Sequence, residues 1–137
     1  MLKTEVLHQL QNDIYCRIQP SPISGVGVFA IKRIPKGTNP FIGCFDNDWI
    51  EISKEELSDL DPNVSKYVQD MCAFQDGVYY VPQCGISKID ISFYLNHSDT
   101  PNMDEEGEGI DFIAARDIEV GEELTVNYDL YNAERGF

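Results

Sequence analysis

Short apolar runs separated by glycine and proline predict a domain built mainly from short β-strands. Residues 25–31 (GVGVFAI) read as a strand entered through glycines, and residues 35–37 (PKG) then close a turn. Asp76-Gly77 has the composition of a hairpin turn and leads into another apolar run. The apolar runs and strands predicted after the first are residues 41–45, 78–81, 110–115 and, after a turn at Val120-Gly121, 124–128.

The middle of the chain has the pattern of a small helical insert, at about residues 52–75. Ser53 and Glu56 form a capping-box signature, which marks the start of a short helix. Asp61-Pro62 ends that helix and begins another, because proline is favoured in the first turn. The spacing i, i+3, i+4, i+7 then predicts a buried helix face made of Val64, Tyr67, Val68 and Met71.

Length and charge limit the classes of function. A chain of 137 residues is long enough to bury a core, so we assign residues 1–137 to a single domain. The chain has 24 acidic residues against 10 lysines and arginines, a net charge of −14. Phosphate binding needs a basic surface, so nucleic acid is disfavoured as a direct partner and a basic protein or peptide is expected. The alternative is that the charge serves only solubility.

The acidic residues concentrate in two segments. Residues 46–61 hold seven acids and one lysine, and residues 104–123 hold nine acids and one arginine. Both segments would suit a groove that receives a basic segment of another protein. Solvated loops and helix faces are the other interpretation, since charge runs usually have that origin.

The cysteines and the apolar content indicate an intracellular protein. Cys16, Cys44, Cys72 and Cys84 form no CxxC pair, so a zinc ribbon or a redox dithiol is not supported and no metal site is expected. We expect buried, reduced thiols. No apolar stretch approaches the length of a membrane span, and residues 1–16 do not resemble a secretory signal. The sequence does not distinguish cytoplasm from nucleus.

Three polar or glycine-rich segments follow one another in a distinctive order. The first, residues 24–30 (SGVGVFA), has glycines that would let the backbone approach a ligand closely. The second, residues 93–102 (FYLNHSDTPN), packs several polar side chains behind an apolar run. The third, residues 121–129 (GEELTVNYD), is a turn and a strand that ends in a tyrosine. Each alone has an ordinary structural explanation: a tight turn, a core histidine and a structural tyrosine.

Together the three segments resemble the SET-domain family of protein lysine methyltransferases. Gly25-Val26-Gly27 is similar to its first motif, residues 96–102 to its NHSxxPN motif, and residues 123–128 to its ELxxxY motif. The resemblance covers roughly residues 14–130 and implies a mainly β, β-clip-like SET-domain fold of short strands. It also implies a knot-like C-terminal arrangement in which the two later motifs thread together. Small viral and bacterial SET proteins are similarly short.

The resemblance also implies an activity and a site. The chain would use S-adenosylmethionine (S-adenosyl-L-methionine) to methylate lysine in a basic protein, such as a histone, with Tyr128 as the catalytic residue. The residues implied to bind the cofactor are Gly25, Val26, Gly27, Val28, Asn96 and His97. The residues implied to line the substrate channel are Phe41, Tyr94, Val126 and Tyr128. By the same resemblance His97 binds the cofactor and is not a general base.

Three departures from the family pattern leave a second interpretation open. Phe93 stands where the family usually has arginine, and Phe41-Ile42-Gly43 stands where it has Tyr-x-Gly. Only nine residues follow Tyr128 and none is cysteine, so we expect no zinc-binding post-SET segment. Leu130, Tyr131 and Phe137, or a second subunit in a homodimer, are candidates to cover the channel. The alternative function is a catalytically silent SET-fold module that binds a protein partner.

Overall fold

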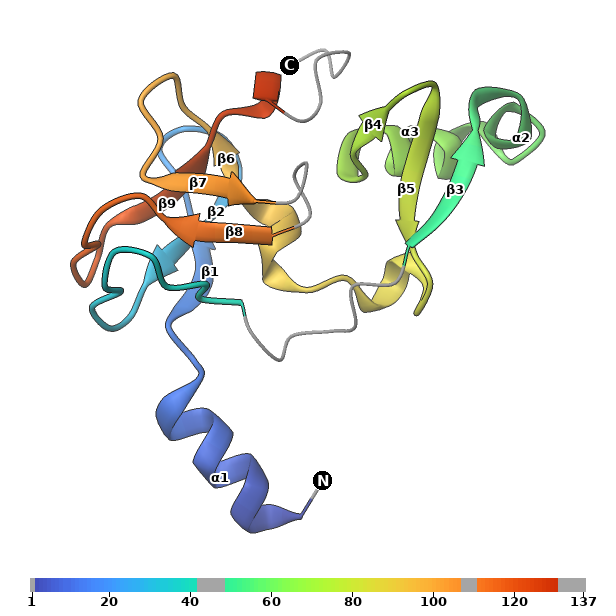
Figure 1. Cartoon of the computed structure of the whole chain (residues 1–137). Coiled ribbons are helices and arrows are strands. Elements are labelled where there is room, and N and C mark those ends of the chain that lie inside the picture. Colours follow the sequence, from blue (N-terminus) through green and yellow to red (C-terminus); the bar gives the residue numbers. More distant parts are fainter. Residues whose placement is uncertain (1, 42–48, 107–110, 131–137) are drawn as a thin grey trace.

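The computed structural model describes residues 2–41, 49–106 and 111–130 and consists mostly of short strands (Figure 1). In chain order the elements are α1 (Lys3–Asn12), β1 (Cys16–Pro20), β2 (Val26–Ala30), β3 (Trp49–Ser53), α2 (Lys54–Ser58), α3 (Pro62–Met71), β4 (Phe74–Gln75), β5 (Val78–Pro82), η1 (Ile86–Lys88), η2 (Ile91–Tyr94), β6 (Asn96–His97), β7 (Met103–Glu106), β8 (Asp111–Ala114), β9 (Glu123–Val126) and η3 (Tyr128–Leu130). The three η elements are single turns of 3₁₀-helix.

The main sheet has the strand order β1-β2-β9-β6, so the last strand of the chain, β9, lies beside β2 from near its beginning. β1 and β2 form an antiparallel hairpin from Cys16↔Ala30 to Pro20↔Val26, which confirms the strand predicted after the glycines. β9 pairs antiparallel with β2 on one side and parallel with β6 on the other. The core beneath this sheet is apolar; its most buried members are Val28, Ile34, Met103, Ile118, Leu124 and Val126.

The hairpin of β7 and β8 packs on the same core. Met103 and Ala114 face one another across this hairpin, and both side chains are buried in the main cluster. In Figure 1 the hairpin lies in front of β9 and β2. The strand predicted at 110–115 is confirmed for residues 111–114, which form β8.

The predicted insert is a separate layer with its own small core. The sheet β3-β5-β4 is accompanied by α2 and α3, and Figure 1 shows this unit to one side of the main sheet. The capping box is confirmed: the Ser53 hydroxyl accepts from Glu56 N–H, and the Glu56 carboxylate accepts from Ser53 N–H, both at 3.1 Å. Asp76 and Gly77 have φ angles of 53° and 81°, as a two-residue hairpin turn requires.

The predicted buried face of α3 is confirmed in part: Val68 is buried and Met71 packs on the insert core. Val64 and Tyr67 are 47% and 41% exposed, whereas Ser65 and Val68 are buried. The Ser65 hydroxyl donates a hydrogen bond to the Leu57 carbonyl of α2, which satisfies this buried polar side chain. Ser65 therefore lies on the buried side of α3 with Val68, while Val64 and Tyr67 lie on the exposed side.

Two further features depart from the sequence-based expectations. The N-terminal helix α1 was not anticipated, and in Figure 1 it projects from the lower end of β1. Cys16 and Cys72 are buried as expected, but Cys84 is exposed. Cys44 lies outside the described residues. None of the helices within the described ranges has both the length and the apolar character needed to cross a bilayer.

Candidate functional site

The three motifs meet through β9. The first motif lies on β2 and pairs with it at Val28↔Leu124, and the second lies on β6 and pairs with it at His97↔Val126. The third motif is β9 itself, which runs into η3 and Tyr128. Segments that are about 70 and 100 residues apart in the chain thus form one surface. The parallel β6–β9 contact joins the two later motifs, as the resemblance implied.

The two glycines of the first motif have different physical roles. Gly25 has φ +48°, a conformation that glycine adopts without strain, and nothing lies within 4 Å of where its Cβ would be. At Gly27 an added Cβ would stand 2.2 Å from Oε2 of Glu123 and 3.1 Å from Nδ2 of Asn96. We expected a side chain at position 27 to enter cofactor space. The structure shows that it would first displace the chain's own Glu123.

The Asn96 side chain is held by its amide nitrogen. Nδ2 donates to the backbone carbonyls of Ser24 (3.2 Å) and Val26 (3.0 Å) and to the Glu123 carboxylate at 2.9 Å. These contacts tie β6 to the loop that carries the first motif. Glu123 belongs to the third motif, but no role was predicted for it from the sequence.

His97 has both ring nitrogens engaged. Nδ1 accepts from the backbone N–H of Tyr128 at 3.0 Å, so the ring proton resides on Nε2, which lies 2.9 Å from the Asp99 carboxylate. A histidine held in this way fixes the start of η3 and has no nitrogen left to take a proton from substrate. The prediction that His97 binds the cofactor stays a prediction, and its partner Asp99 was not predicted.

Tyr128 is half-buried at the end of β9. Its hydroxyl donates to the carbonyl of Leu95 at 2.5 Å, and its ring lies 5.3 Å from that of His97. Phe41 and Tyr94, also half-buried, pack with Tyr128 on the main core. Three of the four predicted channel residues are therefore half-buried aromatic side chains that pack against the same core.

The two valines predicted for the site are buried. Val126, the fourth channel residue, is 2% exposed, and Val28, predicted to contact the cofactor, is fully buried. Both side chains belong to the main core. Neither residue therefore presents appreciable surface, and both serve the packing of the main core. Val26, by contrast, is 42% exposed.

The short helix η2 links the site to the insert. Asp90 caps it by accepting hydrogen bonds from the backbone N–H of Ser92 (2.7 Å) and from the Ser92 hydroxyl, while burial raises the pKa of its carboxyl. Phe93, which stands in place of the family's arginine, packs on the insert core with its ring 6.1 Å from Trp49. Tyr94 faces the main core instead. The short helix η2 therefore contacts both cores, with Phe93 on the insert core and Tyr94 on the main core.

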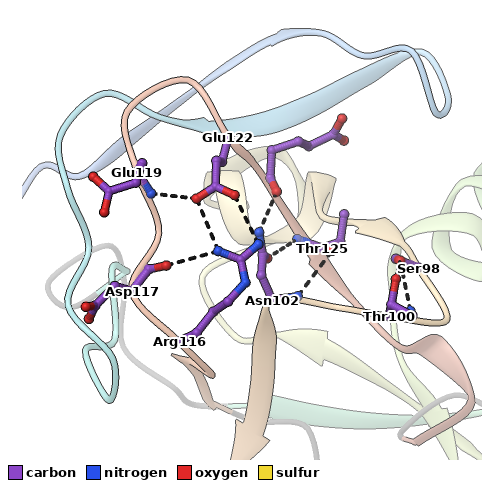
Figure 2. A network of polar contacts seen from close by, with 9 residues as sticks. Ser98, Thr100, Asn102, Arg116, Asp117, Glu119, Glu122 and Thr125 are labelled. Carbon is purple, nitrogen blue, oxygen red and sulfur yellow. Dashed lines mark hydrogen bonds and ion pairs between the residues drawn. The ribbon is translucent and has the colours of Figure 1, made fainter.

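Asn102, the last residue of the second motif, is paired with the backbone of β9 (Figure 2). Its Oδ1 accepts from Thr125 N–H and its Nδ2 donates to the Glu123 carbonyl, both at 2.8 Å. Its own carbonyl accepts from Ala115 N–H at 2.9 Å. The side chain replaces a missing strand partner for β9, a role that the sequence did not reveal.

Ion pairs and hydrogen bonds between charged side chains stabilise the turn before β9 (Figure 2). The Arg116 guanidinium contacts both oxygens of Glu122 at 3.0 and 3.2 Å and donates to the Asp117 carbonyl. This guanidinium, together with Glu119 N–H, lowers the pKa of the Glu122 carboxyl. Arg33 pairs with Asp117 and Glu119. Several acids of the 104–123 segment thus serve the domain's own turns.

Some predicted features lie outside the described residues. These are Ile42, Gly43, most of the 41–45 run, the Leu130 side chain, Tyr131 and Phe137. Within the described ranges, no three side chains of histidine, cysteine, aspartate or glutamate are grouped as ligands for a metal ion.

A comparison with known protein families identifies the domain that these three motifs form. The SET domain family model matches residues 25–129, which spans all three motifs. A Plasmodium falciparum protein assigned as a histone methyltransferase superposes with a TM-score of 0.54 at 18% identity, covering 84% of this chain and 93% of that chain. No curated protein sequence matches significantly.

Two structures of Polycomb Repressive Complex 2 from Chaetomium thermophilum are also similar. One is a humanised mutant bound to the inhibitor GSK126, with a TM-score of 0.53 at 23% identity. The other is an apo complex with two point mutations, with a TM-score of 0.55 at 23% identity. In both, 94% of this chain matches only 18% of the other chain. At these identities the structural likeness establishes the fold.

Proposed function

Because the chain belongs to the SET-domain family, we propose that it transfers a methyl group from S-adenosylmethionine to a lysine side chain of a basic protein. The observation that supports this most is the meeting of Gly25, Asn96, His97 and Tyr128 around β9. A catalytically silent binding module would not need the glycine loop at Gly25, the hydrogen-bonded imidazole of His97 and the Tyr128 hydroxyl on the same surface.

The residues present fit the cofactor's polar end. Asn96 is fixed by its amide nitrogen, and no described residue donates a hydrogen bond to its Oδ1. That oxygen is an acceptor for an ammonium group, and the backbone of the Gly25 loop is accessible beside it. When bound, S-adenosylmethionine supplies an electrophilic methyl group on a positively charged sulfur.

The chain's part of the chemistry is to orient the lysine and favour its uncharged form. A free lysine has a pKa of about 10.4, so it is almost wholly protonated at neutral pH. Aromatic walls of Phe41, Tyr94 and Tyr128 would desolvate the amine and so favour the neutral form. The Tyr128 hydroxyl, anchored by donation to Leu95, keeps acceptor lone pairs that orient the amine.

Calorimetry tests cofactor binding. Protein treated with a metal chelator is expected to bind both S-adenosylmethionine and its demethylated product, since the contacts proposed for them come from the chain alone. Incubation with methyl-labelled cofactor and a panel of basic proteins, followed by mapping of the label, then tests transfer. Absence of binding up to millimolar cofactor would refute the proposal. It would favour the catalytically silent module, an alternative that is also supported by Phe93 standing in place of the family's arginine.

Substrate recognition is expected to depend on salt. Among the described acids of segment 46–61, Glu51, Glu55 and Asp59 are exposed, which suits them to attract a basic substrate. Exposed charges are screened beyond about 8 Å at physiological ionic strength. We therefore expect KM for a basic substrate to rise at least severalfold between low and physiological salt while the cofactor Kd stays nearly constant. A flat KM would show that these acids are only solvated surface.

A further inference from the structure

A polar cluster of Ser21, Asn96 and Glu123 lies where the loop between β1 and β2 (residues 21–25) meets β6 and β9. We propose that Ser21 and Glu123 are positioning residues that hold the Asn96 amide with its oxygen toward the cofactor's amino group. This inference rests on the proposed function, since it specifies how the cofactor's amino-acid end is recognised. No motif indicated Ser21.

Hydrogen bonds connect the three side chains in a closed triangle. The Ser21 hydroxyl donates to the Glu123 carboxylate, with its Oγ 2.7 and 2.9 Å from the two oxygens. Asn96 Nδ2 lies 2.9 Å from Oε2 of Glu123 and 3.1 Å from the Ser21 oxygen. Bonds to an ionised carboxylate are roughly twice as strong as neutral ones. The triangle therefore fixes the amide more firmly than two neutral contacts would.

The neighbours of Asn96 decide which way the amide faces. Its Nδ2 is surrounded by the carboxylate of Glu123 and the carbonyls of Ser24 and Val26, which can only accept hydrogen bonds. A flipped amide would place its oxygen against these three acceptors. Oδ1 must therefore point away from the triangle, where no described residue donates to it. An oriented acceptor of this kind suits an ammonium donor.

Glycine at position 27 makes room for the triangle. A Cβ there would stand 2.2 Å from Glu123 Oε2 and 2.8 Å from its Cδ, so the carboxylate would have to leave Ser21 and Asn96. Ser21 also shapes the loop, because its hydroxyl accepts from Ile23 N–H and its own N–H donates to the Gly25 carbonyl. One cluster thus sets both the loop and the amide.

The test compares two ligands on two variants. Ser21→Ala removes the hydroxyl, and Glu123→Gln removes the charge while leaving the Ser21 loop contacts in place. Dissociation constants are measured for S-adenosylmethionine and for 5′-methylthioadenosine, which keeps the adenosine and sulfur but lacks the amino acid. We expect about a tenfold loss of S-adenosylmethionine affinity in each variant, the size of one hydrogen bond, and no more than a twofold change for 5′-methylthioadenosine.

Controls separate the possible failures. Ser87→Ala changes an exposed serine for which no side-chain hydrogen bond is seen among the described residues, and it should bind both ligands like wild type. Thermal melting confirms that each variant is folded. Equal loss of both ligands would overturn the inference, because the cluster would then only support the loop, and unchanged affinities would overturn it too. A wild-type protein that binds no S-adenosylmethionine would instead refute the proposed function.

Discussion

Tyr128→Phe is expected to lower kcat by about 10²-fold or more while cofactor affinity changes little. The substitution removes one oxygen and keeps the ring that packs on the main core with Phe41 and Tyr94. If the hydroxyl aligns the reacting atoms, its contribution belongs to the transition state, and loss of one preorganised polar contact typically costs on the order of 10²-fold. The cofactor contacts proposed for the Gly25 loop and Asn96 do not involve the hydroxyl.

The hydrogen bonds around Tyr128 indicate that the Tyr128→Phe variant should stay folded. In wild type the hydroxyl donates to the Leu95 carbonyl, and Tyr128 N–H donates to His97. The variant loses the first bond and keeps the second, so β9, β6 and the imidazole should stay in register. Loss of one hydrogen bond costs about 1 kcal/mol of stability, which thermal melting will detect but which leaves the protein folded.

The measurement pairs kcat on the mapped substrate with the cofactor Kd. Tyr67→Phe is the matched control, because it makes the same chemical change on the exposed face of α3 and should leave both values unchanged. A near-normal kcat for Tyr128→Phe would show that Tyr128 has only a structural role. The assignment of the active centre to this region would then be wrong.

The sequence predicted features that depend on neighbouring residues. The glycine-entered strand β2, the Ser53 capping box and the Asp76-Gly77 turn are set by local backbone preferences, and the structure confirms all three. The motif residues were found because their types and spacing are distinctive even without a structure. The family resemblance implied that the two later motifs lie together, but neither it nor any local pattern predicted that they pair as the parallel strands β6 and β9.

The features that were missed depend on contacts between distant segments. Ser21 and Glu123 are 102 residues apart, and nothing near either one indicates the other. Half of the predicted face of α3 is correct: Val68 and Met71 face the insert core, whereas Val64 and Tyr67 are exposed and Ser65, which bonds to Leu57, is buried instead. A period of 3.6 residues predicts that a helix has a buried face, but tertiary partners decide which face it is.

At Gly27 the structure adds a second reason for glycine to the one that the sequence indicated. A glycine beside a ligand loop suggests close approach of the ligand, and that expectation ignored the chain itself. In the structure, the space is needed first by Glu123, whose carboxylate holds Asn96. The loop of the first motif and the third motif therefore depend on one another, and a change in either is expected to affect the other.

Asn102→Ala is expected to destabilise the domain by about 2–5 kcal/mol. The Asn102 side chain is 6% exposed and satisfies the N–H of Thr125 and the carbonyl of Glu123. Alanine would leave both backbone groups of β9 without a partner, and each unsatisfied buried group costs about 1–3 kcal/mol. Domains of this size have total stabilities of about 5–15 kcal/mol, so the loss is a large share of the whole. Urea unfolding at neutral pH measures it.

A second substitution separates hydrogen bonding from the loss of volume. Asn102→Asp keeps the shape and the acceptor for Thr125 N–H, but it turns an acceptor oxygen toward the Glu123 carbonyl. We therefore expect it to be at least as destabilising as alanine at neutral pH, since a buried charge gains no donor there. Asn63→Ala, on the exposed first turn of α3, is the matched control and should change stability by less than about 0.5 kcal/mol. If Asn102→Ala behaves like this control, β9 is held by its neighbouring strands alone, and the second motif does not fix the strand that leads to Tyr128.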